Sequence, residues 1–129
     1  MIRLIVAAAV IERGGRFLVT RRQDGVHLAG LWEFPGGKCN PGEAIGACMA
    51  REIREELAVD IEVGDEILQN SHRYDDREVE LHFLRGVLRG EPTPVLGQEM
   101  RWVSRDELTT LEFPPADAEL IHLLTATGR

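Results

Sequence analysis

Residues 37–59 read GKCNPGEAIGACMAREIREELAV, and this stretch decides both the fold and the expected chemistry. Its second half places carboxylates at Glu52, Glu55 and Glu56, spaced i, i+3 and i+4. On a helix such side chains share one face, where like charges repel one another. A cation between them relieves that repulsion, and carboxylate oxygens are ligands that Mg2+ and Mn2+ prefer. The spacing therefore predicts a divalent-metal site on a helix, a common device for phosphoryl transfer.

The surrounding residues favour a built site over a solvated charged face. Arg51 precedes Glu55 by four positions and can brace it. Pro35-Gly36-Gly37 and Pro41-Gly42 punctuate the loop before the helix, whose N-terminus presents free N–H groups suited to anions. Beside the acidic face, an apolar stripe predicts packing against a core, and it contains Gly46, Met49, Ala50, Ile53 and Leu57.

The same stretch resembles the Nudix box, G-x5-E-x7-R-E-U-x-E-E-x-G-U, in which U is a bulky aliphatic residue. The matching positions are Gly37, Glu43, Arg51, Glu52, Ile53, Glu55, Glu56 and Val59. Ala58 stands where the family usually has a glycine, which ends the helix in the left-handed conformation that alanine adopts less readily. We therefore expect an altered helix exit, with no metal ligand affected.

Other segments resemble the MutT branch of the Nudix family and extend the resemblance over most of the chain. They are Arg21-Arg22, residues 31–38 (LWEFPGGK) and residues 113–117 (FPPAD). MutT-like enzymes hydrolyse nucleoside triphosphates to the monophosphate and pyrophosphate, and the best-known member removes 8-oxo-dGTP from the nucleotide pool. The resemblance implies an α/β fold, an α/β/α sandwich with a mixed β-sheet, in a single domain over residues 1–129.

The resemblance implies a metal site and a base. The expected ion is Mg2+, with Mn2+ as an alternative, and four residues are expected to hold it: Glu52, Glu55, Glu56 and the backbone carbonyl of Gly36. Arg51 is expected to orient the glutamates, and Glu43 to support the loop. Hydrolysis in this branch occurs at the β-phosphorus. The general base is expected to be a box glutamate or the distant Glu99, for which the alternative is an ordinary exposed acid.

The resemblance also implies the nucleotide contacts. Arg22 matches the second arginine of the branch's Arg-Arg pair, and its guanidinium can hold phosphate oxygens with two hydrogen bonds. A solvent-exposed arginine at a strand end is the alternative. Leu4, Val6, Tyr74 and Val79 match positions that line the nucleobase. For Val79, plain core packing is the preferred interpretation.

Asp117 departs from the standard MutT pattern, which has asparagine there. Asparagine offers a donor and an acceptor, whereas an ionised aspartate only accepts. Asp117 can accept from N1–H and the exocyclic amine of a guanine, or from the N4 amine of a cytosine. Relatives acting on CTP and modified cytosine nucleotides have aspartate in the same Pro-Ala-Asp context. Alternatively, Asp117 is only a first-turn acid stabilised by the dipole of the last helix.

The resemblance to the MutT branch implies 8-oxo-dGTP hydrolysis as the leading function. The alternative keeps the chemistry and changes the substrate to CTP, dCTP or a modified cytosine nucleotide. A non-catalytic nucleotide sensor is disfavoured, because such modules usually lose box glutamates and this chain retains them all.

Composition agrees with a small enzyme. A chain of 129 residues fits one domain. Its net charge of −7 argues against a nucleic-acid polymer as partner, since such binders usually carry a basic face. We expect a cytoplasmic protein without a membrane span, as a monomer or weak dimer. Cys39 and Cys48 lack CxxC spacing and are expected to be reduced thiols, with Cys48 serving in packing.

Hydrophobic periodicity predicts the remaining elements. Strands are expected at residues 2–11, 16–20, 61–72, 78–88 and 100–103, and helices at 44–57 and from 115 to about 125. The run at 2–11 leads into the Gly14-Gly15 turn, which favours a buried strand over a signal peptide. Ser104 and Glu107 form a predicted capping box. The four histidines show no metal-ligand spacing, and His82 is expected to be structural.

Overall fold

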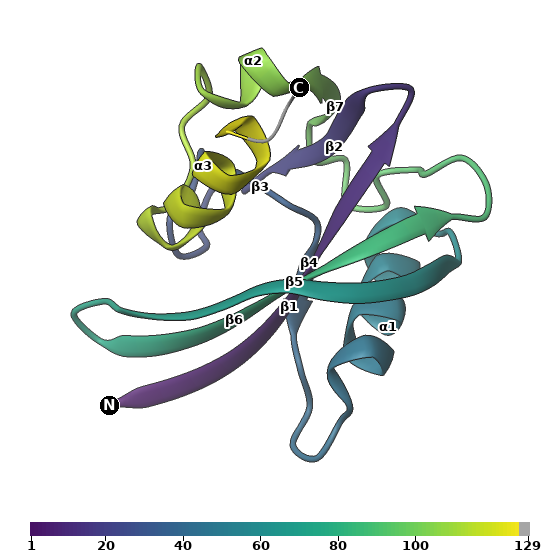
Figure 1. Cartoon of the computed structure of the whole chain (residues 1–129). Helices are drawn as coiled ribbons and strands as arrows, with labels where there is room; N and C mark the ends of the chain where they lie inside the picture. The colour runs from purple at the N-terminus through teal and green to yellow at the C-terminus, as the bar shows by residue number, and fades with distance from the viewer. Residues whose placement is uncertain (127–129) are drawn as a thin grey trace.

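The structure, a computed structural model, describes residues 1–126. Its elements are shown in Figure 1. The strands are β1 (Ile2–Arg13), β2 (Arg16–Arg21), β3 (Trp32–Glu33), β4 (Gly36–Lys38), β5 (Ile61–Arg73), β6 (Arg77–Leu88) and β7 (Met100–Ser104). The helices are α1 (Ile45–Leu57), α2 (Arg105–Leu108), the 3-10 helix η1 (Pro115–Asp117) and α3 (Ala118–Ala126).

The strands form a mixed sheet, as expected. Their order is β3-β2-β1-β6-β5, with β4 paired to β1 and β7 paired to β2. β1 and β6 run parallel, whereas the other pairs are antiparallel. β1 crosses the middle of the molecule and reaches both halves of the sheet (Figure 1). It therefore links the strands that precede α1 with those that follow it.

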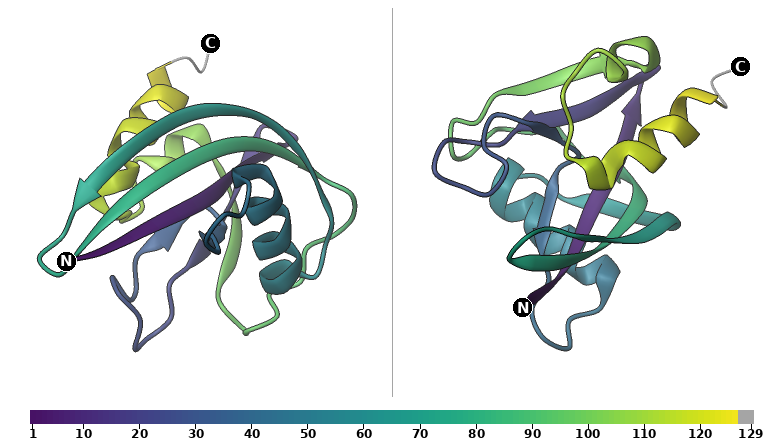
Figure 2. Two further views of the ribbon diagram at one scale, coloured as in Figure 1. Left: turned by 90° about the horizontal axis from the view of Figure 1, so that it is seen from below. Right: turned by 90° about the vertical axis from the view of Figure 1, so that its left-hand side faces the viewer.

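Alternation along β1 sends successive side chains to opposite faces and builds two cores. The core under α1 contains, among others, Ala7, Ala9, Ile11, Met49, Ile53 and Leu57. The core under α3 contains, among others, Ala8, Val10, Phe17, Phe83, Leu120 and Leu124. Helices thus cover both faces of the sheet, as can be followed in Figure 2. The expected α/β/α sandwich is confirmed.

Most predicted elements begin and end within two or three residues of the observed ones. Gly14 and Gly15 turn β1 into β2 at φ angles of 59° and 78°, where glycine is unstrained. The capping box is confirmed, because Ser104 and Glu107 exchange both hydrogen bonds. The short strands β3 and β4 were not predicted, since two or three residues show no alternation. No helix within residues 1–126 is long and apolar enough to cross a membrane.

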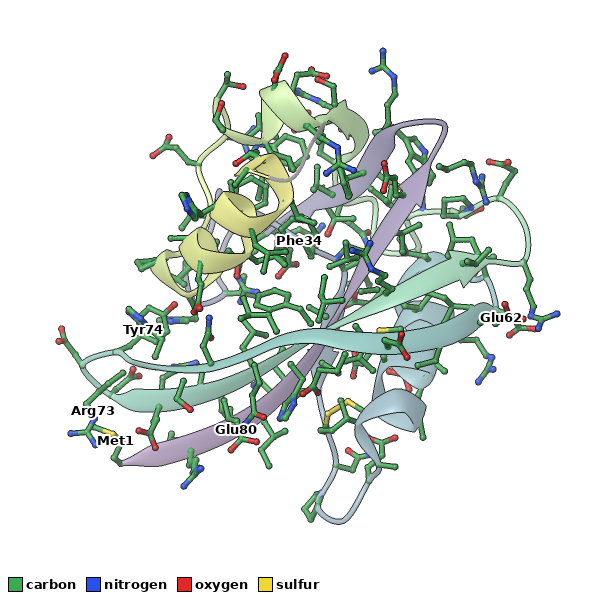
Figure 3. The ribbon with its side chains drawn as sticks, viewed as in Figure 1. Met1, Phe34, Glu62, Arg73, Tyr74 and Glu80 are labelled. Atoms are coloured by element: carbon green, nitrogen blue, oxygen red, sulfur yellow. A yellow bond between two sulfur atoms is a disulfide. The ribbon has the colours of Figure 1, made fainter. Side chains whose placement is uncertain are left out.

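Two expectations about α1 and its loop are wrong. Ala58 takes φ 53° and ψ 39°, and its N–H donates to the Arg54 carbonyl at 3.0 Å, so the helix ends in the left-handed conformation after all. The burial of Leu57 and Val59 on either side fixes that exit. Cys39 and Cys48 are not free thiols but a disulfide, with Cα atoms 5.2 Å apart. The sulfur atoms appear as a yellow bond beside α1 in Figure 3.

His82 is structural in the sense expected. Its ring is buried, with Nδ1 2.7 Å from Glu66 and Nε2 2.7 Å from Glu80. These two carboxylates raise the pKa of His82 against the lowering effect of burial. The ring therefore joins β6 to β5 through Glu66.

Candidate active site

Two glycines of β4 bring the acidic face of α1 against the sheet. Gly36 and Gly37 pair with Ala8 and Ala7 of β1. A side chain on Gly37 would occupy the space of the Glu52 carboxylate, and one on Gly36 would collide with the backbone of β1. Because both positions lack a side chain, the strand and the helix approach closely, and the Glu52 carboxylate reaches β4.

Arg51 is the centre of an ionic network at this junction. Its Nε and Nη2 donate to the Glu43 carboxylate at 2.8 and 2.9 Å. Its Nη1 donates to Glu52 at 2.9 Å and to Glu55 at 3.2 Å. Nη2 also donates to the Lys38 carbonyl at 3.0 Å. The hydrogen bonds from Arg51 lower the pKa of Glu43 to about 2, so this pair is ionised across the physiological range.

The box glutamates occupy different environments. Glu52 and Glu56 face a cavity, whereas the Glu55 side chain is 59% exposed and is turned toward Arg51. Burial, together with the negative charges of Glu33 and Glu52, raises the pKa of Glu56 to about 8. Without a cation this carboxyl therefore holds its proton at neutral pH.

The cavity has a volume of about 370 Å³ and joins two groups of residues. The acidic group comes from β4 and α1 and contains Gly36, Gly37, Lys38, Glu52 and Glu56. The second group is mainly apolar and comes from β1, β6, the β3–β4 and β5–β6 connections and the region of η1. This apolar group contains Leu4, Val6, Phe34, Tyr74, Val79, Pro114 and Ala116, with the carboxyl of Asp117 beside them. Phe34 lies beneath α3, and Tyr74 lies at the turn between β5 and β6 (Figure 3).

All five residues predicted to contact the substrate line this cavity: Leu4, Val6, Arg22, Tyr74 and Asp117. Val79 lines it too, although packing was the preferred interpretation for that residue. Asp117 is 5% exposed, and its N–H donates to the Pro114 carbonyl at 3.0 Å. Burial, and then the charge of Glu33, raises the pKa of Asp117 to about 7. Near neutral pH its neutral form, a donor as well as an acceptor, is therefore populated.

Glu99 does not reach the cavity. Its carboxylate lies 3.3 Å from Arg21 and 3.2 Å from Arg101. Both guanidinium groups stand over the Trp32 ring, at 5.8 and 4.8 Å from its centroid. Glu99 lines a separate, more open hollow with Arg21 and its neighbours. This arrangement matches the alternative interpretation of Glu99 as an exposed loop acid.

Sequence reasoning missed Glu33. Its carboxylate accepts a hydrogen bond from Arg22 Nη1 at 2.8 Å, while Arg22 Nε donates to the His27 carbonyl at 2.6 Å. Glu33 also lines the cavity, and its negative charge raises the pKa values of both Glu56 and Asp117. The only sequence signal for Glu33 was its position directly before Phe34 in the MutT-like segment at residues 31–38.

His27 adds an unpartnered polar atom to the cavity wall. Among residues 1–126, only His27 Nε2 and Asn70 Oδ1 are buried side-chain polar atoms without a hydrogen-bond partner. The His27 ring packs edge-on against Tyr74, with centroids 4.8 Å apart. A bound molecule that fills the cavity can supply the missing partner.

The donor set fits a hard divalent cation. Glu52 and Glu56 offer carboxylate oxygens close to the Gly36 backbone, and the pKa of Glu56 is raised by burial and by the negative charges of Glu33 and Glu52, which a bound cation would offset. Within the described part of the chain, the one set of three metal-ligating side chains whose ligand atoms lie within 4.8 Å of one another is Cys39, Glu43 and Cys48. Its sulfur atoms are bonded to each other, so it offers no thiolate. An ion held by all three box glutamates requires Glu55 to leave Arg51.

Comparison with known proteins agrees with the geometry. A family model described as NUDIX domain matches residues 6–123. A protein of Escherichia coli (strain K12) named CTP pyrophosphohydrolase is 33% identical over 126 residues, covering 94% of this chain and 90% of the relative. A Mycobacterium tuberculosis protein named putative 8-oxo-dGTP diphosphatase 2 is 37% identical over 134 residues, covering 98% and 92%.

Solved structures show the same fold. The solution structure of the E. coli ORF135 protein superposes with a TM-score of 0.85 at 33% identity, covering 98% of this chain and 91% of that chain. The crystal structure of a MutT protein from Methanosarcina mazei Go1 gives 0.87 at 26% identity, covering 99% and 96%. The sequence resemblance is therefore confirmed, and the chain belongs to the Nudix family.

Proposed function

We propose that this chain is a metal-dependent nucleoside triphosphate pyrophosphohydrolase with 8-oxo-dGTP as its leading substrate. The products are the nucleoside monophosphate and pyrophosphate. The observation that carries the proposal is one cavity that joins Glu52 and Glu56 to an apolar wall ending at Asp117. Relatives named for 8-oxo-dGTP hydrolysis, at 32–37% identity over most of the chain, support it.

Glu52, Glu56 and the Gly36 carbonyl, joined by Glu55, are the residues proposed to hold Mg2+ or Mn2+. The ion supplies Lewis acidity and offsets the roughly four negative charges of a triphosphate. Arg51 holds Glu52 in place through its 2.9 Å hydrogen bond, and Glu43 in turn holds Arg51. Arg22 stands at the wall between the two groups, where its guanidinium can bind a phosphate oxygen.

We assign the general base to one of the two carboxylates that face the cavity, Glu52 or Glu56. Proton abstraction requires a base within hydrogen-bond reach of the attacking water. Glu99 is held by Arg21 and Arg101 over Trp32 and does not meet that requirement in this structure.

We propose that Asp117 reads the base edge in its neutral form. Burial favours that form near neutral pH, and a neutral carboxyl donates one hydrogen bond and accepts another, as asparagine does. The N1–H and O6 edge of a guanine offers the complementary pattern. The N4 amine and N3 of a cytosine offer one as well, which keeps CTP, dCTP and modified cytosine nucleotides as the alternative substrates.

The test is pyrophosphate release with Mg2+ from 8-oxo-dGTP, dGTP, CTP, dCTP and 5-methyl-dCTP. A large kcat/KM advantage for 8-oxo-dGTP over dGTP supports the proposal, and a preference for cytosine nucleotides selects the alternative. Glu52→Gln should abolish turnover of any accepted substrate. Tight nucleotide binding without turnover by the wild type would instead indicate a sensor.

The remaining proposals follow from the same function. A single domain over residues 1–129 acts on a small nucleotide in the cytoplasm, as a monomer or weak dimer. The acidic net charge of −7 supports a nucleotide rather than a nucleic-acid polymer as the bound molecule. Removal of oxidised nucleotides would place the enzyme in the protection of DNA.

A further inference from the structure

The Cys39–Cys48 disulfide spans the part of the chain that the proposed metal site depends on. Cys39 follows β4 directly, three positions after Gly36. Cys48 lies in α1, four positions before Glu52. The bond therefore closes a short loop that holds Pro41-Gly42 and Glu43 and joins strand to helix.

The two cysteines differ in exposure. Cys48 is 0% exposed, and its sulfur lies 3.8 Å from the Gly37 carbonyl. Cys39 is half-buried and borders the exposed turn at Pro41-Gly42. Cys39 is therefore the more open side of the bond to an incoming thiolate, whereas the Cys48 sulfur is shielded by the core under α1.

The bond is not the main support of the fold. A domain of this size can bury about two-thirds of its unfolded surface, and this chain has an apolar core on each face of its sheet. The disulfide instead fastens one local junction, beside the Arg51 network. Making or breaking this bond would therefore change how firmly β4 is held against α1.

We propose that Cys39 and Cys48 form a site of reversible thiol–disulfide modification, and that reduction loosens the metal-binding junction between β4 and α1. Its effect on hydrolysis rests on the proposed function, whereas the modification itself does not. The natural co-reactant is a low-molecular-weight thiol of the cell.

The exchange has two balanced steps. A thiolate attacks the Cys39 sulfur, the sulfur–sulfur bond breaks, and Cys48 leaves as a thiolate that takes up a proton. The product is a mixed disulfide on Cys39. A second thiolate then attacks the outer sulfur, releases Cys39 as a thiolate that is protonated, and yields the oxidised small disulfide. Two small thiols are oxidised as the protein disulfide is reduced.

The junction should loosen without opening. Cys39 N–H donates to the Ile5 carbonyl at 2.8 Å, and Arg51 contacts the Lys38 carbonyl and Glu43. None of these contacts uses a sulfur atom, so we expect them to persist after reduction. The loop regains backbone freedom, and Gly36 and Glu52 lose one of the links that hold them in register. We therefore expect weaker metal binding in a protein that remains folded.

The experiment compares wild type with the Cys39→Ser/Cys48→Ser double variant, each with and without dithiothreitol. Thiols are counted in the denatured protein, Tm is measured, and Mn2+ affinity is followed by electron paramagnetic resonance. In wild type we expect two thiols to appear only after reduction, Tm to fall by about 10 °C, and Mn2+ affinity to fall by up to about tenfold. The double variant should resemble reduced wild type and ignore the reductant.

Two results would overturn the inference. One is two free thiols in wild type even after treatment with oxidised dithiothreitol. The other is Mn2+ affinity that stays the same on reduction. None of these readouts requires nucleotide turnover. Failure to hydrolyse any nucleotide would therefore refute the proposed function, whereas the thiol, Tm and Mn2+ results would remain interpretable.

Discussion

Ala58 offers a sharp test of how α1 ends. It occupies the left-handed region at φ 53° and ψ 39°, and its side chain is exposed. Glycine at this position would relieve the steric cost of the left-handed conformation, about 1–2 kcal/mol. It would lose no buried contact. We therefore predict that Ala58→Gly stabilises the protein.

The size of the gain follows from two opposing effects. Glycine increases the conformational entropy of the unfolded chain, which costs about 0.4–1 kcal/mol. The net gain in the free energy of unfolding is then about 0.5–1 kcal/mol, or about 2–4 °C in Tm for a chain of this length. Urea unfolding and calorimetry of the oxidised, metal-free protein measure both quantities.

Ala47→Gly is the matched control. Ala47 is also exposed, but it lies within α1, outside the set of residues with positive φ. Glycine there should destabilise by about 0.5–1 kcal/mol, so the same chemical change has opposite signs at the two positions. If Ala58→Gly were neutral or destabilising while Ala47→Gly behaved as expected, the assignment of strain to Ala58 would be wrong.

Three further outcomes test the site. The metal-free protein should lose stability as pH rises from 4.5, the ordinary pKa of a glutamate, to about 8, the pKa of Glu56 in the folded protein, because the folded state binds the Glu56 proton more tightly than the unfolded chain does. Urea unfolding in the presence of a chelator measures this loss, and Mg2+ should reverse it. Stability that rises between pH 4.5 and 8 would contradict the prediction. Wild-type KM for the preferred nucleotide should increase as pH rises through about 7, because Asp117 then loses the proton that it donates to the nucleobase. The Asp117→Asn variant should lack this pH dependence. If the KM profiles of wild type and variant coincide, neutral Asp117 does not recognise the nucleobase. Arg51→Met should weaken Mn2+ binding on the order of 10–100-fold. The control Arg54→Met loses only an exposed ion pair with Asp60 and should leave Mn2+ affinity unchanged. Equal effects of the two substitutions would show that the Arg51 network does not support the metal site.

The fold was largely predictable because its signals are local. The apolar run at residues 2–11, the strand pattern at 78–88 and the box helix at 44–57 predicted elements that the structure contains with small shifts in their bounds. Strands β3 and β4 escaped prediction because each depends on a partner strand rather than on its own pattern. Their contribution to the site was therefore visible only through the resemblance.

The site was predictable in part, for a related reason. The box residues are close in sequence, whereas Leu4, Tyr74 and Asp117 are brought together by the parallel pairing of β1 with β6 and by η1. Resemblance supplied those three, but it offered no role for Glu33. The disulfide escaped because the proximity of Cys39 to Cys48 depends on how the intervening turn folds back, which spacing alone does not specify.

The parallel pairing of β1 and β6 has a consequence for how the chain folds. Its register joins Ile2 to Arg77 and Ile11 to Gly86, so the first strand finds its neighbour about 75 residues later along the chain. Contacts of such high sequence separation carry a large loop-closure entropy and slow the search for the native topology. During synthesis, β1 leaves the ribosome long before β6 does. Until β6 emerges, the apolar residues of β1 can be covered only by elements made before it, chiefly β2, β4 and α1, and the rest of their surface stays open to aggregation.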